Sequence, residues 1–199
     1  MIEGQPRGRG VATILLVMLV AVTAVPGADA TTLLYVDLER MSREAPMVVH
    51  GHVAWDYAVQ KEAPGDIWSY TGVEVATCVE GECPETVVLQ HRGGTVGDLT
   101  LHIPGMPRFQ PGQEVLLFLR PAPGGEEGML SVFGMAQGHF VVVEDENGKK
   151  TAVQQLGKVT LASQGQAGAI VPLAVAPIVE ELSILIQRIR TLAAQGGGQ

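Results

Sequence analysis

The stretch Val115-Leu116-Leu117-Phe118-Leu119 decides the fold, because five consecutive apolar residues predict the most buried strand of a β-sheet core. Shorter runs with strand-like alternation lie on both sides of it and are separated by turn residues. They span residues 47–57, 67–79, 84–90, 99–103, 129–133, 139–144 and 150–156. These short strands, without alternating helices, indicate a mainly β fold, a small closed or nearly closed antiparallel β-barrel.

Alternation within the two longest runs predicts which side chains share a face. In the first run, one face carries Met47, Val49, Val53, Trp55 and Tyr57, and the other carries His50, His52 and Asp56. Gly51 falls on the apolar face, where a missing side chain permits sharp coiling or a bulge. In the second run, Trp68 and Tyr70 lie opposite Ile67 and Val73.

Two helices complete the predicted architecture. Residues 37–45 form a short N-terminal helix with Asp37 as its N-cap, and Pro46 ends it. Residues 177–194 form a C-terminal amphipathic helix, because apolar side chains recur there at i, i+4, i+7 and i+8. We therefore expect a barrel domain over 31–156, a linker over 157–176, this helix, and a flexible tail over 195–199.

Residues 1–30 have the pattern of a signal peptide. Arg7 and Arg9 precede an uninterrupted apolar run over 11–25, and Ala28-Asp29-Ala30 supplies the small-x-small cleavage pattern. The run is shorter than the roughly 20 residues that a membrane-spanning helix needs. We expect cleavage before Thr31, a secreted or periplasmic protein, and no membrane insertion after signal removal. An uncleaved anchor is the alternative.

The charge and composition of the chain exclude several classes of protein. Of its 199 residues, 13 are Lys or Arg and 21 are Asp or Glu, which gives a formal net charge of −8. Binding of a nucleic-acid backbone needs a basic face, so we expect no nucleic-acid partner. A hydrophobic content of 46% is too high for an intrinsically disordered chain.

Cys78 and Cys83 are the only cysteines and enclose four residues. In an oxidising compartment this spacing predicts one disulfide that closes a hairpin loop. A metal site is the alternative, but it would need two further ligands, and only His91 lies near in the sequence.

His50 and His52 are the candidate metal ligands, because residues i and i+2 of a strand point to the same side. Zinc and copper accept two histidines together with a carboxylate. Asp56 lies roughly 20 Å from His50 along an extended strand, so it cannot join them. Further ligands would have to come from His91, His102 or His139; without them, the pair is two polar side chains on a solvated strand face.

Trp55 and Trp68, together with Tyr57 or Tyr70, form a candidate carbohydrate platform, provided that they are exposed. We favour the other interpretation, in which these side chains pack beneath the C-terminal helix.

The common catalytic motifs are missing from the sequence. It contains neither G-x-S-x-G nor H-E-x-x-H, and its glycine pairs, Gly93-Gly94 and Gly124-Gly125, are not followed by the Lys-Ser/Thr of a phosphate-binding loop. We therefore expect no enzymatic activity and no cofactor.

Two segments resemble a pattern shared by a group of uncharacterised exported bacterial proteins. The segments are Pro104–Leu119 (PGMPRFQPGQEVLLFL) and Phe133–Phe140 (FGMAQGHF). The second matches a G-x-x-Q-G-x-F pattern through Gly134, Gln137, Gly138 and Phe140. The resemblance covers about residues 46–143; it implies export, and it carries no activity.

A second resemblance, to the netrin-like domain, rests on a short helix that leads into Val48-Val49-His50-Gly51-His52-Val53. It implies an OB-like barrel. Tissue inhibitors of metalloproteases contain this domain and chelate the protease zinc through an amino-terminal cysteine. The expected mature chain begins at Thr31, so that inhibitory mechanism is not carried over.

The sequence thus leads to three hypotheses about function. The first is an exported, non-enzymatic β-barrel module that binds a protein or cell-surface partner. The alternatives are a protease-associated inhibitor or accessory domain, and a periplasmic metal-binding protein that uses His50 and His52.

Overall fold

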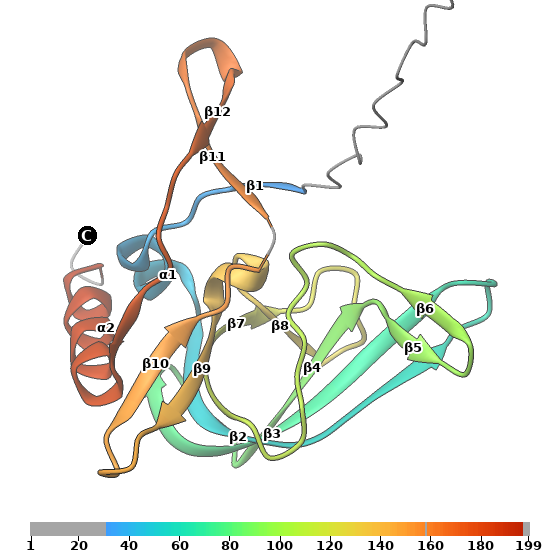
Figure 1. Ribbon diagram of the computed structural model, residues 1–199, viewed down its shortest axis with the longest axis horizontal. Coiled ribbons are helices and arrows are strands. Elements are labelled where there is room, and N and C mark those ends of the chain that lie inside the picture. Colours follow the sequence, from blue (N-terminus) through green and yellow to red (C-terminus); the bar gives the residue numbers. More distant parts are fainter. Residues whose placement is uncertain (1–30, 158, 197–199) are drawn as a thin grey trace, which may run out of the picture.

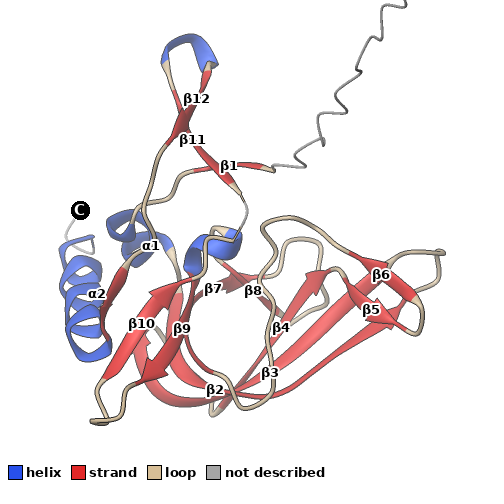
Figure 2. Ribbon diagram, in the orientation of Figure 1, coloured by secondary structure: helices blue, strands red, loops and turns tan. Residues whose placement is uncertain are grey.

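The computed structural model describes residues 31–157 and 159–196. The expected signal peptide (1–30) and the last residues of the expected tail (197–199) lie outside the described residues. The fold is mainly β, with a short helix near the start and a longer helix at the end (Figures 1 and 2). The helices are α1 (Leu38–Glu44) and α2 (Leu182–Gly196), with 3-10 turns η1 (Met135–Gly138) and η2 (Gln166–Gly168). The strands are β1 (Thr32–Leu34), β2 (Met47–Gln60), β3 (Ile67–Glu80), β4 (Thr86–Arg92), β5 (Gly94–Val96), β6 (Leu99–Leu101), β7 (Glu114–Pro121), β8 (Leu130–Val132), β9 (His139–Glu144), β10 (Lys150–Gln154), β11 (Thr160–Gln164), β12 (Ile170–Leu173) and β13 (Val179–Glu181).

Five strands close the barrel. They follow the order β2-β3-β4-β8-β7, and β7 pairs back onto β2. The expected small closed barrel is confirmed, but it is mixed rather than purely antiparallel, because β4 and β8 run parallel at Leu89 and Leu130. The reason is geometric: an odd number of strands cannot alternate in direction all the way around a ring.

β7 lies between two hydrophobic cores, which explains its continuous apolar sequence. Val115, Leu117 and Leu119 belong to the core inside the barrel. Leu116 and Phe118 belong to a second core, formed between the outside of the sheet and the two helices. All five side chains are fully buried, as the sequence predicts.

Both expected helices are present, and the C-terminal helix begins and ends later than the sequence predicts. The Asp37 carboxylate accepts a hydrogen bond from the Arg40 amide at 2.7 Å, which confirms the predicted N-cap of α1. α2 begins at Leu182 rather than 177, because residues 179–181 pair with β10 as strand β13. It extends through 195–196, part of the expected tail. None of the helices within the described ranges is long and apolar enough to cross a membrane.

The segment 157–176, where the sequence predicts a linker, contains the hairpin β11–β12. This hairpin and β1 form a small three-stranded sheet that projects from the barrel (Figure 1). β1 runs parallel to β11, with Leu33 opposite Leu161. The pairing partner lies more than a hundred residues away, so a local pattern of small and polar residues does not reveal it.

The β2–β3 pair contains register shifts that decide which side chains face outward. Beside Gly51 the register shifts, but the extra residue is Ala76 of β3, because His50 lies opposite Thr77 and Gly51 opposite Val75. A Cβ at Gly51 would overlap the Glu74 carbonyl. A second shift at Ala54 places Val53 opposite Val73 and Trp55 opposite Gly72. The extra residue reverses the alternation of the side chains. Trp55 and Tyr57 therefore lie on the outside of the barrel, whereas the sequence pattern places them on the core face with Val53.

Candidate functional site

The four aromatic side chains of the sequence-predicted platform lie together on the outer face of β2 and β3. We call Trp55, Tyr57, Trp68 and Tyr70 the aromatic face. Tyr57 lies directly opposite Tyr70. Trp55 is 36% and Tyr57 51% exposed. Packing beneath α2, the interpretation that the sequence favours, is wrong, because α2 covers the second core, to which none of the four belongs.

Three of these rings form a nearly parallel row. The centroids of Trp55 and Tyr57 are 5.3 Å apart with planes 29° apart. Those of Tyr57 and Tyr70 are 5.5 Å apart with planes 17° apart. Tyr57, the most exposed, is therefore the central ring of the row.

Hydrogen bonds fix the buried end of this row. The Tyr70 hydroxyl donates to Glu126 at 2.6 Å and accepts from the Gln90 amide at 2.9 Å. Lys61 donates to the same Glu126 oxygen at 3.0 Å. The hydrogen bond from Tyr70, followed by that from Lys61, lowers the pKa of the Glu126 carboxyl. The network joins the loop between β2 and β3 to the loop between β7 and β8.

Trp68 serves as a support rather than as an open contact surface. Its indole nitrogen donates to Asp66 at 3.0 Å. The Lys61 ammonium lies 4.6 Å and the Arg92 guanidinium 5.6 Å from its ring centroids, so cations already cover the ring. Arg92 also pairs with Asp66 at 2.6 Å.

The four rings come from two neighbouring barrel strands. Trp55 and Tyr57 lie on β2, and Trp68 and Tyr70 lie on β3.

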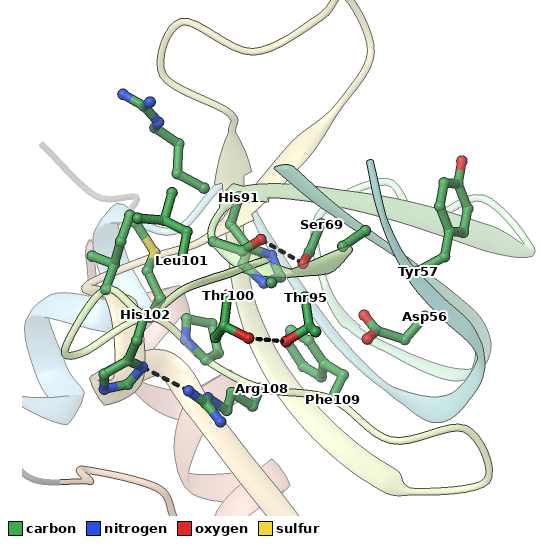
Figure 3. A pocket seen from close by; sticks show the side chains of 17 residues that line it. Asp56, Tyr57, Ser69, His91, Thr95, Thr100, Leu101, His102, Arg108 and Phe109 are labelled. Carbon is green, nitrogen blue, oxygen red and sulfur yellow. Dashed lines mark hydrogen bonds between the residues drawn. The ribbon is translucent and has the colours of Figure 1, made fainter. Parts of the chain in front are cut away.

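A polar cavity of about 320 Å³ lies on the inner face of β2, β3 and β4 (Figure 3). Asp56 points into it, whereas Tyr57, its neighbour in the chain, points away. Asp56 accepts a hydrogen bond from Thr71 at 2.5 Å. His91 and Ser69 also line the cavity, but the Ser69 hydroxyl donates to the Gly93 carbonyl at 2.7 Å. The Ser69 hydroxyl therefore donates its hydrogen bond to the main chain and not to a side chain that could act as a general base.

His139 is buried beside this cavity. Its ring centroid lies 4.8 Å from that of Phe109, and His91 contacts the same phenyl ring at 5.9 Å. In the part of the chain that the structure describes, the Nε2 atom of His139 has no hydrogen-bond partner. Burial, and then the proximity of His91, lower the pKa of His139 to about 4. Burial also lowers the pKa of His91, against the opposing effect of Asp56.

His50 and His52 lie on the outer face of β2 and are joined there by Glu114, which the sequence reasoning missed. His50 Nε2 lies 2.6 Å and His52 Nε2 3.8 Å from the two Glu114 oxygens. Lys150 donates to both oxygens at 2.8 and 3.0 Å. Burial alone raises the pKa of Glu114, but the hydrogen bonds from Lys150 and His50 outweigh it and lower that pKa.

The other histidines do not complete this group. His91 and His139 lie near Phe109, and His102 contacts Arg108 at 2.6 Å. Among the described residues, no group of three or more His, Cys, Asp or Glu side chains is arranged to hold a metal ion. Glu114, the carboxylate between the two histidines, can be identified only from the pairing of β2 with β7, which places His52 opposite Glu114.

The predicted disulfide is confirmed. Cys78 at the end of β3 is bonded to Cys83 in the loop before β4, with their Cα atoms 5.6 Å apart. The bond closes the connection between these strands.

Two residues of the second segment in the bacterial resemblance, Ala136 and Gln137, make hydrogen bonds to distant parts of the chain. The Gln137 side chain accepts from the Val36 amide at 2.9 Å and donates to the Leu34 carbonyl at 3.0 Å, which attaches the segment before α1 to the barrel. The Ala136 amide donates to Gly105 at 2.9 Å and joins the two matched segments. No family model, curated protein or solved structure matches this chain.

Proposed function

We propose that the protein is an exported, non-enzymatic binding module that attaches to a cell-surface partner through the aromatic face. The exposure of Trp55 and Tyr57, next to each other on the outer face of the barrel, supports this most directly. Exposed apolar groups gathered in one place commonly mark interaction sites.

The aromatic face is also organised before it binds. Trp55 rests on Gly72, and Tyr70 is held by Glu126 and Gln90. A partner therefore loses little free energy to the ordering of these side chains. Export is supported by the signal-peptide pattern of residues 1–30 and by the disulfide, since disulfides persist in oxidising compartments.

The test is co-sedimentation of the secreted, oxidised protein with fragments of bacterial cell envelope. We expect the wild type to sediment with them and the Trp55→Ala/Tyr57→Ala variant to stay in solution. The matched control is Val143→Ala/Ile184→Ala, which removes two comparably exposed apolar side chains from β9 and α2. Equal sedimentation of both variants would contradict the proposal, as would turnover in a screen of hydrolase substrates.

A further inference from the structure

The cavity on the inner face of β2, β3 and β4 contains a carboxylate. Asp56 points into the cavity, whereas Tyr57 points away from it (Figure 3). The register shift at Ala54 explains this arrangement, since the extra residue that turns Trp55 outward turns the next side chain inward. The cavity shares Phe109 with the apolar core of the barrel, so the carboxylate lies next to that core.

The half-buried Asp56 carboxylate has one hydrogen-bond partner among the described residues. The fully buried Thr71 hydroxyl donates to it at 2.5 Å. None of the ion pairs within the described ranges includes Asp56. Removal of a carboxylate from water costs free energy, which a single hydroxyl offsets only in part. A cation held against Asp56 would offset the remainder.

The two arginines that line the cavity do not supply this cation. The Arg92 guanidinium is already bonded to the Asp66 carboxylate at 2.6 Å. The Arg108 guanidinium contacts the His102 ring at 2.6 Å. Both arginine side chains are exposed, and neither forms an ion pair with Asp56.

The other groups that line the cavity are uncharged and leave it open. Burial lowers the pKa of His91 against the effect of nearby Asp56, so its ring is neutral at pH 7. Phe109 supplies an aromatic ring, a group that attracts cations. Gly94 has a φ of +130°, and a Cβ there would overlap Ala58, so this wall has no room for a side chain. The volume of about 320 Å³ lies at the small end of the range for ligand sites, about 300–1,000 Å³.

From the geometry and charge of this cavity we infer that it binds a small organic cation with an alkylammonium group. The ammonium donates hydrogen bonds to the Asp56 carboxylate, and the alkyl chain packs against the Phe109 ring. This site goes beyond the proposed function, because it lies on the opposite face of the strands from Trp55 and Tyr57. The alkylammonium group belongs either to a free amine or to the lysine side chain of a partner, which share the same chemistry.

The experiment is a calorimetric titration of the oxidised protein at pH 7 with three probes of similar size and different charge. They are n-butylamine, which is protonated at this pH, 1-butanol and butyrate. We expect butylamine to bind at least about tenfold more tightly than 1-butanol, because hydrogen bonds to charged groups are the stronger ones. Its affinity should fall as the salt concentration rises. Equal affinity of the three probes, tighter binding of butyrate, or no binding of butylamine overturns the inference.

Two variants assign the binding to the cavity. Asp56→Asn keeps an oxygen that accepts from Thr71 but removes the charge, and we expect it to weaken butylamine binding at least about tenfold. Ala58→Leu narrows the cavity without a change of charge and should weaken binding at least about threefold. Glu74→Gln, which removes an exposed carboxylate from β3, is the matched control and should bind like the wild type.

Denaturant unfolding checks that each variant is folded, and if one of the two cavity variants is not, the other decides. Unchanged butylamine binding by a folded cavity variant overturns the inference.

Two further probes distinguish the sources of the alkylammonium group. Tighter binding of 1,4-diaminobutane than of the peptide Gly-Lys-Gly identifies a free amine as the ligand, and the reverse order identifies a lysine side chain. Calcium chloride is the inorganic comparison. If calcium binds more tightly than every amine and Asp56→Asn abolishes its binding, the carboxylate holds a metal ion and the inference is wrong.

Discussion

The indole ring of Trp55 lies directly over Gly72, its partner on the neighbouring strand. A Cβ at position 72 would overlap the indole atoms Cε2 and Nε1. The glycine thus leaves the space that the indole ring occupies. Trp55 reaches this position only because the bulge at Ala54 turns it outward.

Substitution Gly72→Val should displace the indole without unfolding the barrel. The overlapping group is an exposed side chain that can swing into solvent, so we expect a small change in stability and a shift of tryptophan emission. Binding to envelope fragments should fall about tenfold, because the row of rings loses one end. Glu74→Ala, an exposed position two residues along the same strand, is the control. Undiminished binding by Gly72→Val would show that Trp55 does not contact the partner.

The bulge at Ala54 cannot be predicted from the sequence pattern. Gly51 indicates a backbone constraint in advance, and the structure supplies the reason, since a Cβ there would overlap the Glu74 carbonyl. Ala54 gives no such indication, and strict alternation therefore places Trp55 and Tyr57 on the core face. The error affects only the residues after the bulge; Val49 and Val53 do face the barrel interior, as predicted.

Local patterns were sufficient for β7, for the Asp37 cap and for the disulfide, because each depends on neighbouring residues alone. They were insufficient wherever a distant segment supplies the partner. β11 pairs with β1, and Glu114 joins His50 only through the β2–β7 register. The four aromatic candidates were visible in the sequence, but the loop residues that hold them, Lys61 and Glu126, come together only in the closed barrel.

Gln137→Leu should destabilise the protein by about 2–4 kcal/mol. The substitution leaves the Val36 amide and the Leu34 carbonyl without their partner, and each unsatisfied buried group costs about 1–3 kcal/mol. Gln155→Leu is the matched control, because that side chain bonds only to Val153, two residues away. Denaturant unfolding measures both. A Gln137→Leu variant as stable as the control would rule out a role for this side chain in anchoring the segment before α1.

Stability should decrease between pH 7 and pH 5 because of His139. Its pKa is about 4 in the folded protein and 6.5 in the unfolded chain. Below pH 6.5 the unfolded state therefore takes up a proton that the folded state does not, and stability falls as the pH is lowered. The loss is about 2 kcal/mol at pH 5 and approaches 3 kcal/mol near pH 4.

His139→Phe should remove most of this pH dependence, because the apolar ring takes up no proton and the unpartnered Nε2 atom disappears. His91, whose pKa is lowered in the same direction, accounts for the remaining slope. His102→Gln, in an exposed loop, should keep the wild-type slope. Parallel denaturant titrations at pH 7, 6 and 5 compare the three proteins; an unchanged slope in His139→Phe would assign the acid sensitivity to other groups.

The disulfide should contribute about 2 kcal/mol to stability, because its loop is short and the constraint that it places on the unfolded chain is correspondingly modest. Cys78→Ala/Cys83→Ala should unfold at a lower denaturant concentration than the oxidised wild type, with a similar dependence on denaturant. Reduction of the wild type should reproduce the same loss, since Cys78 is exposed to the reductant. The reductant should leave the double variant unchanged, which makes the variant its own control. If reduction and substitution differ in effect, the alanines have altered packing at the end of β3. If neither has an effect, the bond does not stabilise the fold.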